Sequence, residues 1–349
     1  MAYSTIIKPT DYFNTKLYTG TSSGNQAVTG VGFQPDWIWT KNRVDAFGSN
    51  LYDAIRGTGY YLQSNNTSAS QSVVASLISF DSDGFTVGTG DNVQYTSNNG
   101  VAWNWKAGTT SGITTNGATV TTPSSYSFNQ TAGFSILQYT GTGVTNNKLA
   151  HGLGVKPDFI IFKKTSGDIN WGIYHQSLTA DYRLLFTTGA KSDDDSFMQD
   201  SEPDSVNINL GYGGLNNASG ATYIAYCFAD VQGYSKFGSY TGNGSTDGAF
   251  IYTGFKPALV IFKKTSGTGG WNMFDTKRDP FNVQDQILRA NANNAEASDS
   301  GYSDNDFLSN GFKLRQTWGE MNGSGATYIY MAFAEAPLVG TNNVPANAR

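Results

Sequence analysis

One nine-residue stretch occurs three times in the chain and constrains the fold more than any other feature. The copies are Gln34–Asn42, Lys156–Lys164 and Lys256–Lys264. Each has a proline near its start, then β-branched and aromatic residues, then lysine. Proline is compatible with the first residue of a strand, which can go without its N–H bond. Because the apolar run fills both faces, we predict a central strand covered on both sides, with the lysines where the chain leaves the core.

The three copies lie at constant distances from two other markers. A Tyr-Thr-Gly turn precedes each copy, and its glycine lies 15, 16 and 15 residues before the proline. The residue 18 positions after each proline is polar and follows an aromatic residue; these residues are Asp53, His175 and Asp275. Two spacings that hold across three copies indicate a triplicated unit.

The residues around these markers predict an all-β chain. Matching runs at Gly220–Ala229 and Gly325–Ala334, with a weaker version at Gly100–Ala107, alternate aromatic and small residues as a strand on a packed sheet does. Asp-Gly and Asn-Gly turns within Ser82–Phe85 and Ser309–Phe312 precede two further strands. Aromatic residues make up 14% of the chain and 41 residues are glycine, which is typical of short strands joined by many turns.

We therefore predict three tandem homologous β-sandwich domains of the jelly-roll type. The predicted boundaries are an N-terminal segment at 1–13, unit 1 at 14–108, a linker at 109–132, unit 2 at 133–231, unit 3 at 232–337 and a flexible tail at 338–349. The linker stretch Thr109–Thr131 also fits a pair of edge strands. Gln284–Ala297 has no clean apolar stripe, so we interpret it as a loop with one turn at most.

Charge and composition exclude several classes of protein. A net charge of −5 and a pI near 5.0 show no basic footprint, so nucleic acid is not an expected partner. The N-terminus lacks a cationic region followed by an apolar core, and no apolar run approaches the ~20 residues of a membrane helix. We therefore expect a soluble protein made in a cytoplasm, with no signal peptide and no membrane insertion. The single cysteine, Cys227, rules out an intrachain disulfide and is expected to be a buried small residue.

The histidines do not suggest catalysis. The chain has two: His151 lies in a turn before a strand proline, and His175 takes the position that Asp53 and Asp275 hold in the other copies. We interpret both as surface or turn histidines. The chain has no His-Glu-x-x-His helix, phosphate loop or dinucleotide fingerprint. We therefore expect neither an enzyme nor a bound cofactor.

Some carboxylates have a structural interpretation. Asp53 with Arg56, and Asp275 with Arg278, repeat at the same three-residue spacing. Because two copies share this pair, we interpret it as an ion pair that orders a loop. The run Asp193–Asp195 is interpreted as a solvated loop, since adjacent carboxylates diverge.

Other carboxylates and tryptophans are candidates for ligand binding. Asp299, Asp304 and Asp306 lie in a loop rich in Ser and Asn that could hold calcium, but the EF-hand spacing is absent and we assign no metal site. Trp318 is the expected surface aromatic. For the matched Trp171 and Trp271 we favour a core position, with stacking on a sugar ring as the alternative. The candidate ligand-binding residues are Trp318, Asp299, Asp304, Asp306, Trp171 and Trp271.

Several stretches resemble proteins of marine tailed bacteriophages. They are Gly32–Trp37, Asp53–Gly57, Ser82–Phe85, Trp103–Gly108, Ala150–Gly154, Tyr223–Phe228 and Gly233–Gly244. The resemblance covers most of the chain and departs at Asn104, where a cysteine is common in those proteins. It implies a virion component, fibre-like or exposed on the particle, with a lectin-like β-sandwich fold, and it carries over no catalytic residue.

These observations together suggest a bacteriophage virion structural protein. The leading interpretation is a tail fibre or receptor-binding protein that adheres to host surface glycans, because polar loops with aromatic anchors are typical of recognition surfaces. The alternative is capsid decoration, as a head fibre or cement protein, or tail assembly without receptor binding. A polysaccharide-degrading enzyme, which needs a convergent pair of carboxylates, is the third interpretation. We expect other virion proteins as partners and a homo-oligomer, trimeric in a fibre.

Overall fold

The chain is built almost wholly of strands. The computed structural model describes residues 4–21, 23–90, 93, 99–116, 120–298, 302–339 and 345–347. Strand makes up 44% and helix 3%, and the prediction of an all-β fold is confirmed. The helices among the described residues are short: η1 (Pro9–Asp11), η2 (Gln176–Leu178) and α1 (Asp195–Met198).

Each third of the chain contributes one large antiparallel sheet, and we call the thirds unit 1 (residues 13–105), unit 2 (120–228) and unit 3 (235–337). The sheet of unit 1 has the order β1 (Phe13–Thr19), β9 (Asn99–Trp105), β3 (Trp37–Asn42), β4 (Asn50–Asp53), β5 (Tyr60–Gln63), β6 (Gln71–Ser72). That of unit 2 is β11 (Ser125–Asn129), β12 (Phe134–Thr140), β19 (Thr222–Phe228), β14 (Phe159–Lys164), β15 (Gly172–His175), with β16 (Tyr182–Arg183) and β17 (Ser192–Asp193) paired separately. That of unit 3 is β20 (Ser235–Thr241), β28 (Thr327–Pro337), β22 (Phe255–Lys264), β23 (Trp271–Asp275), β24 (Gln286–Arg289), β25 (Ala297–Ser298).

A small three-stranded sheet accompanies each large one. In unit 1 it is β2 (Gln26–Thr29), β8 (Gly84–Val87) and β7 (Leu77–Asp81). In unit 2 it is β10 (Val120–Thr121), β13 (Asn147–Ala150) and β18 (Asn207–Leu210), and in unit 3 it is β21 (Phe250–Tyr252), β27 (Gly311–Leu314) and β26 (Asn305–Leu308). The predicted Asp-Gly and Asn-Gly turns do precede β8 and β27. Within each unit, one apolar cluster lies between the large and the small sheet, so each unit is a β-sandwich.

The repeated stretch forms β3, β14 and β22, and each of these strands has a hydrogen-bonded strand on both sides. Most of their residues are buried, which confirms the prediction of a central strand. Pro257 lies within β22 rather than before it, at a shift in register with β28. A bulge tolerates proline because the ladder is already interrupted there.

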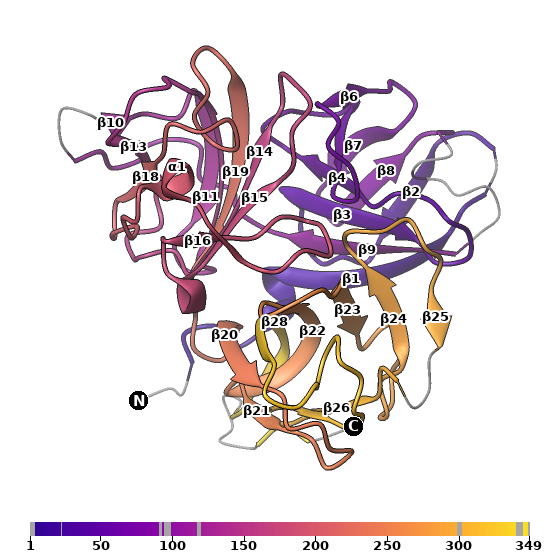
Figure 1. Ribbon diagram of the computed structural model, residues 1–349. Helices are drawn as coiled ribbons and strands as arrows, with labels where there is room; N and C mark the ends of the chain where they lie inside the picture. The colour runs from indigo at the N-terminus through magenta and orange to yellow at the C-terminus, as the bar shows by residue number, and fades with distance from the viewer. Residues whose placement is uncertain are drawn as a thin grey trace.

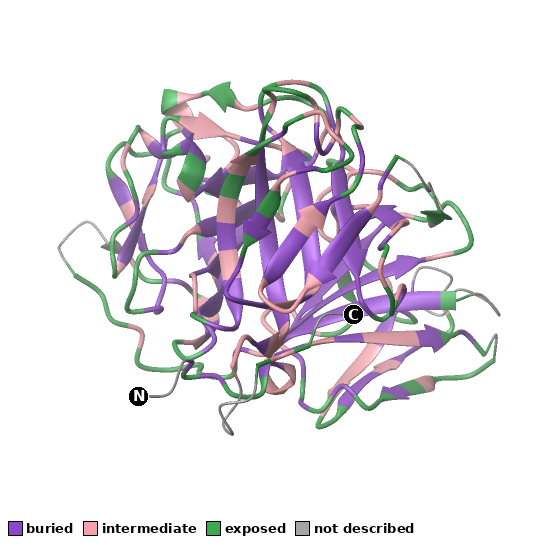
Figure 2. Cartoon of the chain, turned by 90° about the horizontal axis from the view of Figure 1, so that it is seen from below, coloured by how far each residue is buried: buried purple, intermediate pink, exposed green. Residues whose placement is uncertain are grey.

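The second face of each large sheet packs at the centre of the molecule, where the three units meet (Figure 1). This common core contains residues of all three units, and its long strands are buried along most of their length (Figure 2). Trp105, Phe228 and Phe333 hold the same position in β9, β19 and β28, and their rings form a closed triangle with centroids 5.4–6.4 Å apart. The repeated strands are apolar on both faces because each large sheet is covered on both faces.

Two of the predicted connecting segments contain strands. Gln284–Ala297 is not only a loop: it contains β24, because Ile287 and Leu288 are buried and β24 pairs with β23. Thr109–Thr131 contains β10 and β11, so the edge-strand interpretation is confirmed there. The predicted flexible tail lies mostly outside the described residues, within which Val339 and Pro345 form an isolated bridge.

Candidate functional site

Three matched lysines cross the junctions between units. Lys163 Nζ donates to the carbonyl of Ile169 in its own unit and to that of Thr67 in unit 1, at 3.0 and 3.1 Å. Lys263 Nζ likewise donates to Gly269 O at 2.6 Å and to Thr188 O of unit 2 at 3.2 Å. Lys41 Nζ completes the set by donating to Phe47 O and to Ala292 O of unit 3. Unit 2 therefore binds unit 1, unit 3 binds unit 2 and unit 1 binds unit 3, which closes a cycle.

These lysines are structural. All three are buried, so the prediction that they lie where the chain leaves the core is wrong. The next residues, Lys164 and Lys264, are only partly buried. Burial lowers the pKa of Lys41, Lys163 and Lys263 to about 8, because removal from water disfavours the charged form. Sequence reasoning missed their role, although lysine at the same position of all three copies was the signal.

The polar residues 18 positions after each proline, Asp53, His175 and Asp275, lie at the same junctions. The predicted ion pairs are present, with Arg56 Nε 2.6 Å from Asp53 Oδ2 and Arg278 Nε 2.5 Å from Asp275 Oδ2. Each carboxylate also accepts a hydrogen bond from the closing strand of another unit. Tyr226 of unit 2 donates to Asp53 at 2.7 Å, and Trp103 Nε1 of unit 1 donates to Asp275 at 3.1 Å. The pairs thus join units as well as ordering loops.

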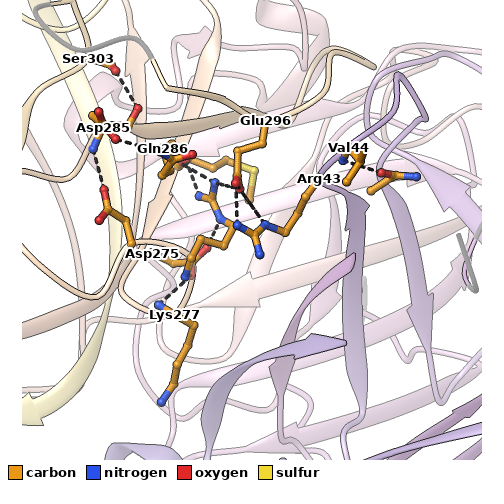
Figure 3. A network of polar contacts seen from close by, with 12 residues as sticks. Arg43, Val44, Asp275, Lys277, Asp285, Gln286, Glu296 and Ser303 are labelled. Carbon is orange, nitrogen blue, oxygen red and sulfur yellow. Dashed lines mark hydrogen bonds and ion pairs between the residues drawn. The ribbon is translucent and has the colours of Figure 1, made fainter. Parts of the chain in front are cut away.

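One junction carries an additional carboxylate. Glu296 of unit 3 accepts hydrogen bonds from Arg278 Nη1 at 2.9 Å and from Arg43 Nη2 of unit 1 at 2.7 Å. Figure 3 shows the Glu296 carboxylate facing the Arg43 guanidinium from the opposite side of the junction. This network has two arginines and two carboxylates, so its charges are balanced.

Both histidines are buried, and the prediction of surface histidines is wrong. His175 lies at the matched position in unit 2, where its Nδ1 accepts from Ser177 N at 3.1 Å and its Nε2 faces Tyr330 O of unit 3 at 3.3 Å. His151 makes the same pair of bonds, with Leu153 N and Asp204 O. Burial lowers the pKa of both to about 4, so each is a neutral imidazole with its proton on Nε2.

The matched tryptophans are core residues. Trp171 and Trp271 are 1% and 2% exposed, which confirms the core interpretation and contradicts a role in stacking on a sugar. Their indole N–H groups cross the junctions too: Trp171 donates to Gln63 O at 2.9 Å and Trp271 to Leu185 O at 2.8 Å. A ring enclosed by a neighbouring unit has no face left for a ligand.

The remaining candidates lie in unit 3. Trp318 packs against the core cluster of that unit, and the Arg289 guanidinium lies 5.6 Å from its ring centroid. Asp306 is mostly buried and pairs with Arg315 at 2.5 Å. The backbone carbonyl of Asp304 accepts from Arg315 N, while Asp299 lies outside the described residues. Ligand binding by Trp318, Asp304, Asp306 or Asp299 stays a prediction.

The described residues include no group of three or more His, Cys, Asp or Glu side chains placed to hold a metal ion. Within the same ranges, no helix has the length and apolar content to cross a membrane. The Asp193–Asp195 run is ordered rather than free, because Asp194 caps α1 and pairs with Arg183. Cys227 is buried as predicted, and burial raises the pKa of its thiol to about 12.

A groove lies at the junction of units 1 and 2, and sequence reasoning missed it. Its volume is about 480 Å³, and its lining residues are Ile55, Arg56, Tyr60, Ser70, Gln138 and Thr165. The Arg56 side chain reaches the surface with 5% of its area, and Tyr60 is 45% exposed. A cation, an aromatic ring and neutral polar groups in one concavity form an arrangement typical of small-ligand sites.

Comparison with known proteins identifies a family but no close relative. A family model described as a domain of unknown function matches residues 8–337, which is nearly the whole chain. No curated protein and no solved structure matches.

Proposed function

The chain belongs to the DUF7483 family, and we propose that it is a structural protein exposed on a bacteriophage virion that adheres to host surface glycans. The sequence resemblance to proteins of marine tailed phages supports the virion assignment. The geometry supports a recognition role, for the reasons that follow.

The observation that carries this proposal is the cyclic junction of the three sandwiches. Three matched lysines, two ion pairs and a common aromatic core bind the units into one body. Such a body holds the loops of three sandwiches in constant relative positions. Rigid display of polar and aromatic loops lowers the entropy cost of binding, which favours adhesion to a repeating surface such as a glycan layer.

The state of the two histidines and the cysteine argues against catalysis by these groups. His151 and His175 are neutral and hydrogen-bonded on both ring nitrogens. Cys227 is buried with a raised pKa. A general base or nucleophile must reach a substrate from a solvent-accessible site, and these three groups do not.

A second candidate function is attachment to other virion proteins, as in capsid decoration or tail assembly. It is favoured by large apolar side chains exposed in unit 3. Phe250 and Tyr252 are 46% and 53% exposed on β21, and Phe281 is 72% exposed. Exposed aromatic residues are enriched in protein interfaces. The proposal therefore includes other virion proteins as partners.

The expected homo-oligomer, a trimer in a fibre, is also part of the proposal. Sedimentation of the purified chain tests it, because a trimer has three times the 37.5 kDa of one chain. Threefold symmetry between chains would then add to the internal threefold arrangement.

Two experiments test the function. The purified chain, fluorescently labelled, is applied to an array of bacterial surface polysaccharides, and adhesion predicts retention on specific glycans. Cryo-electron microscopy of phage particles that contain the chain then locates it. Density at the distal tail supports adhesion, whereas density across the capsid faces contradicts it and favours decoration.

A further inference from the structure

The two Asp–Arg pairs of units 1 and 3 are an internal comparison, because they have the same geometry. Arg56 and Arg278 each bond the aspartate three residues before them through Nε. Each also donates through Nη2 to a backbone carbonyl two residues before that aspartate, Leu51 O and Met273 O, at 2.9 Å. The two sites therefore differ in the residues around each arginine and not in the ion pair itself.

Glu296 and Ser70 occupy the same position at their junctions. Each directly precedes the edge strand of its unit, β25 or β6. The backbone N–H of Glu296 donates to Arg43 O at 2.9 Å, and that of Ser70 donates to Thr165 O at 3.1 Å. Arg43 and Thr165 are themselves matched, since each comes two residues after the buried lysine of its copy. The side chain facing the arginine is thus a carboxylate in unit 3 and a hydroxyl in unit 1.

This substitution changes the electrostatics and the shape of the junction. Arg278 has two carboxylate partners, Asp275 and Glu296, and its side chain is fully buried. Among the described residues Arg56 has one carboxylate partner, Asp53, and its Nη1 meets the Ser70 hydroxyl at 3.2 Å. The serine side chain ends at the hydroxyl on Cβ, whereas that of glutamate continues with a second methylene and a carboxylate. Arg56 and Ser70 both line the groove of about 480 Å³.

We propose that this groove binds the carboxylate of an acidic saccharide, such as a uronic acid, in the place that the Glu296 carboxylate takes in unit 3. A carboxylate is the group that the Arg56 guanidinium binds most strongly, and partial burial strengthens the bond. The exposed ring of Tyr60 offers a face to the sugar ring, and Gln138 and Thr165 offer partners for hydroxyl groups. The volume lies within the range of about 300–1,000 Å³ that is usual for ligand sites. This inference rests on the proposed adhesion and names its ligand class.

The test is a calorimetric titration of the whole chain with D-glucuronate, with D-glucose as the neutral probe and acetate as the carboxylate without a sugar. Glucuronate is expected to bind at least ~10-fold more tightly than either, because each control lacks one of the two recognised features. Equal binding of glucose and glucuronate overturns the carboxylate site, and equal binding of acetate and glucuronate overturns the saccharide.

Variants of Ser70 locate the site. Ser70→Glu restores the carboxylate of the unit 3 copy, and is expected to lower glucuronate affinity at least ~10-fold while the thermal midpoint stays the same or rises. Ser70→Ala keeps the groove open and is expected to change affinity less than ~3-fold. Tyr60→Ala, a surface change that leaves the ion pair intact, is expected to weaken glucuronate but not acetate. Wild-type affinity in Ser70→Glu overturns the assignment.

The polysaccharide array separates this inference from the proposed function. If the chain binds glycans on the array but binds no glucuronate in solution, the groove is wrongly assigned and adhesion stands. If the chain binds no glycan on the array and no glucuronate in solution, both proposals are overturned.

Discussion

The hydroxyl of Tyr226 donates to Oδ2 of Asp53 across the junction of units 2 and 1, at a distance of 2.7 Å. The same oxygen accepts from Arg56 Nε, so one buried carboxylate joins a strand of one unit to a loop of another. The matched contact at the next junction uses a different donor, the indole of Trp103. At the third, His175 replaces the aspartate and faces a backbone carbonyl. The junction tolerates changes of residue provided that its polar groups stay paired.

Tyr226→Phe is expected to lower the free energy of unfolding by about 1.5–3 kcal/mol, because the lost bond is made to a charged acceptor. Chemical denaturation with and without the change measures it. Tyr139→Phe is the matched control: its hydroxyl donates to the neutral carbonyl of Asn216 within one unit, and the expected loss is about 1 kcal/mol. Equal losses would show that the bond across the junction stabilises the protein no more than the bond within one unit.

Lys163→Met is expected to destabilise the protein by about 3 kcal/mol or more. Methionine has a similar shape but leaves the carbonyls of Thr67, Lys164 and Ile169 without their donor, and each unpaired buried carbonyl costs about 1–3 kcal/mol. The neighbouring Lys164→Met removes a partly exposed lysine from the same strand and is expected to change stability by less than about 0.5 kcal/mol. Denaturant midpoints compare the two, and similar shifts would contradict a structural role for Lys163.

The buried histidines are expected to make the protein less stable in mild acid. Their pKa falls from 6.5 to about 4 in the folded chain, so between these values the unfolded chain binds more protons than the folded one. The contribution of each neutral histidine to the free energy of unfolding is therefore fully present above about pH 6.5 and is lost as the pH falls toward 4. At pH 5 each histidine is expected to contribute a loss of about 2 kcal/mol relative to pH 7.5.

His175→Gln isolates this effect from the carboxylates, which titrate in both proteins. The difference in unfolding free energy between pH 7.5 and pH 5 is expected to be smaller in the variant by about 2 kcal/mol. His151→Gln is expected to have the same effect, since the His151 ring also bonds one backbone N–H and one backbone carbonyl. An unchanged pH dependence in both variants would mean that these imidazoles do not control it.

The three units are expected to unfold in one transition. The common core contains Trp37 and Trp105 of unit 1, Trp171 of unit 2 and Trp271 of unit 3, so unfolding one unit exposes the faces of the other two. Tryptophan fluorescence reports the common core and far-ultraviolet circular dichroism reports all sheets, and their urea transitions are expected to coincide. Separate transitions would instead indicate independent domains in a row.

Much of the architecture is determined by the sequence locally. The repeated stretch predicts three central strands because β-branched and aromatic residues around a leading proline leave few other conformations. The aspartate–arginine spacing predicts the two ion pairs because partners three residues apart meet within one loop. The burial of Cys227 follows from its apolar neighbours Tyr226 and Phe228, and that of Trp171 and Trp271 is predicted from their matched positions at the start of a strand.

The closed arrangement of the units was decided only by the tertiary structure. Lys41, Lys163 and Lys263 look like strand ends in sequence, and they are buried because another unit supplies their carbonyl acceptors. His175 looks exposed until β28 covers it. Ser70 and Glu296 become comparable only when their edge strands are placed beside Arg56 and Arg278. The contacts of the lysines and of His175 between units join residues 75 to 251 positions apart. Such contacts depend on which sheet faces meet, and local sequence patterns do not encode that choice.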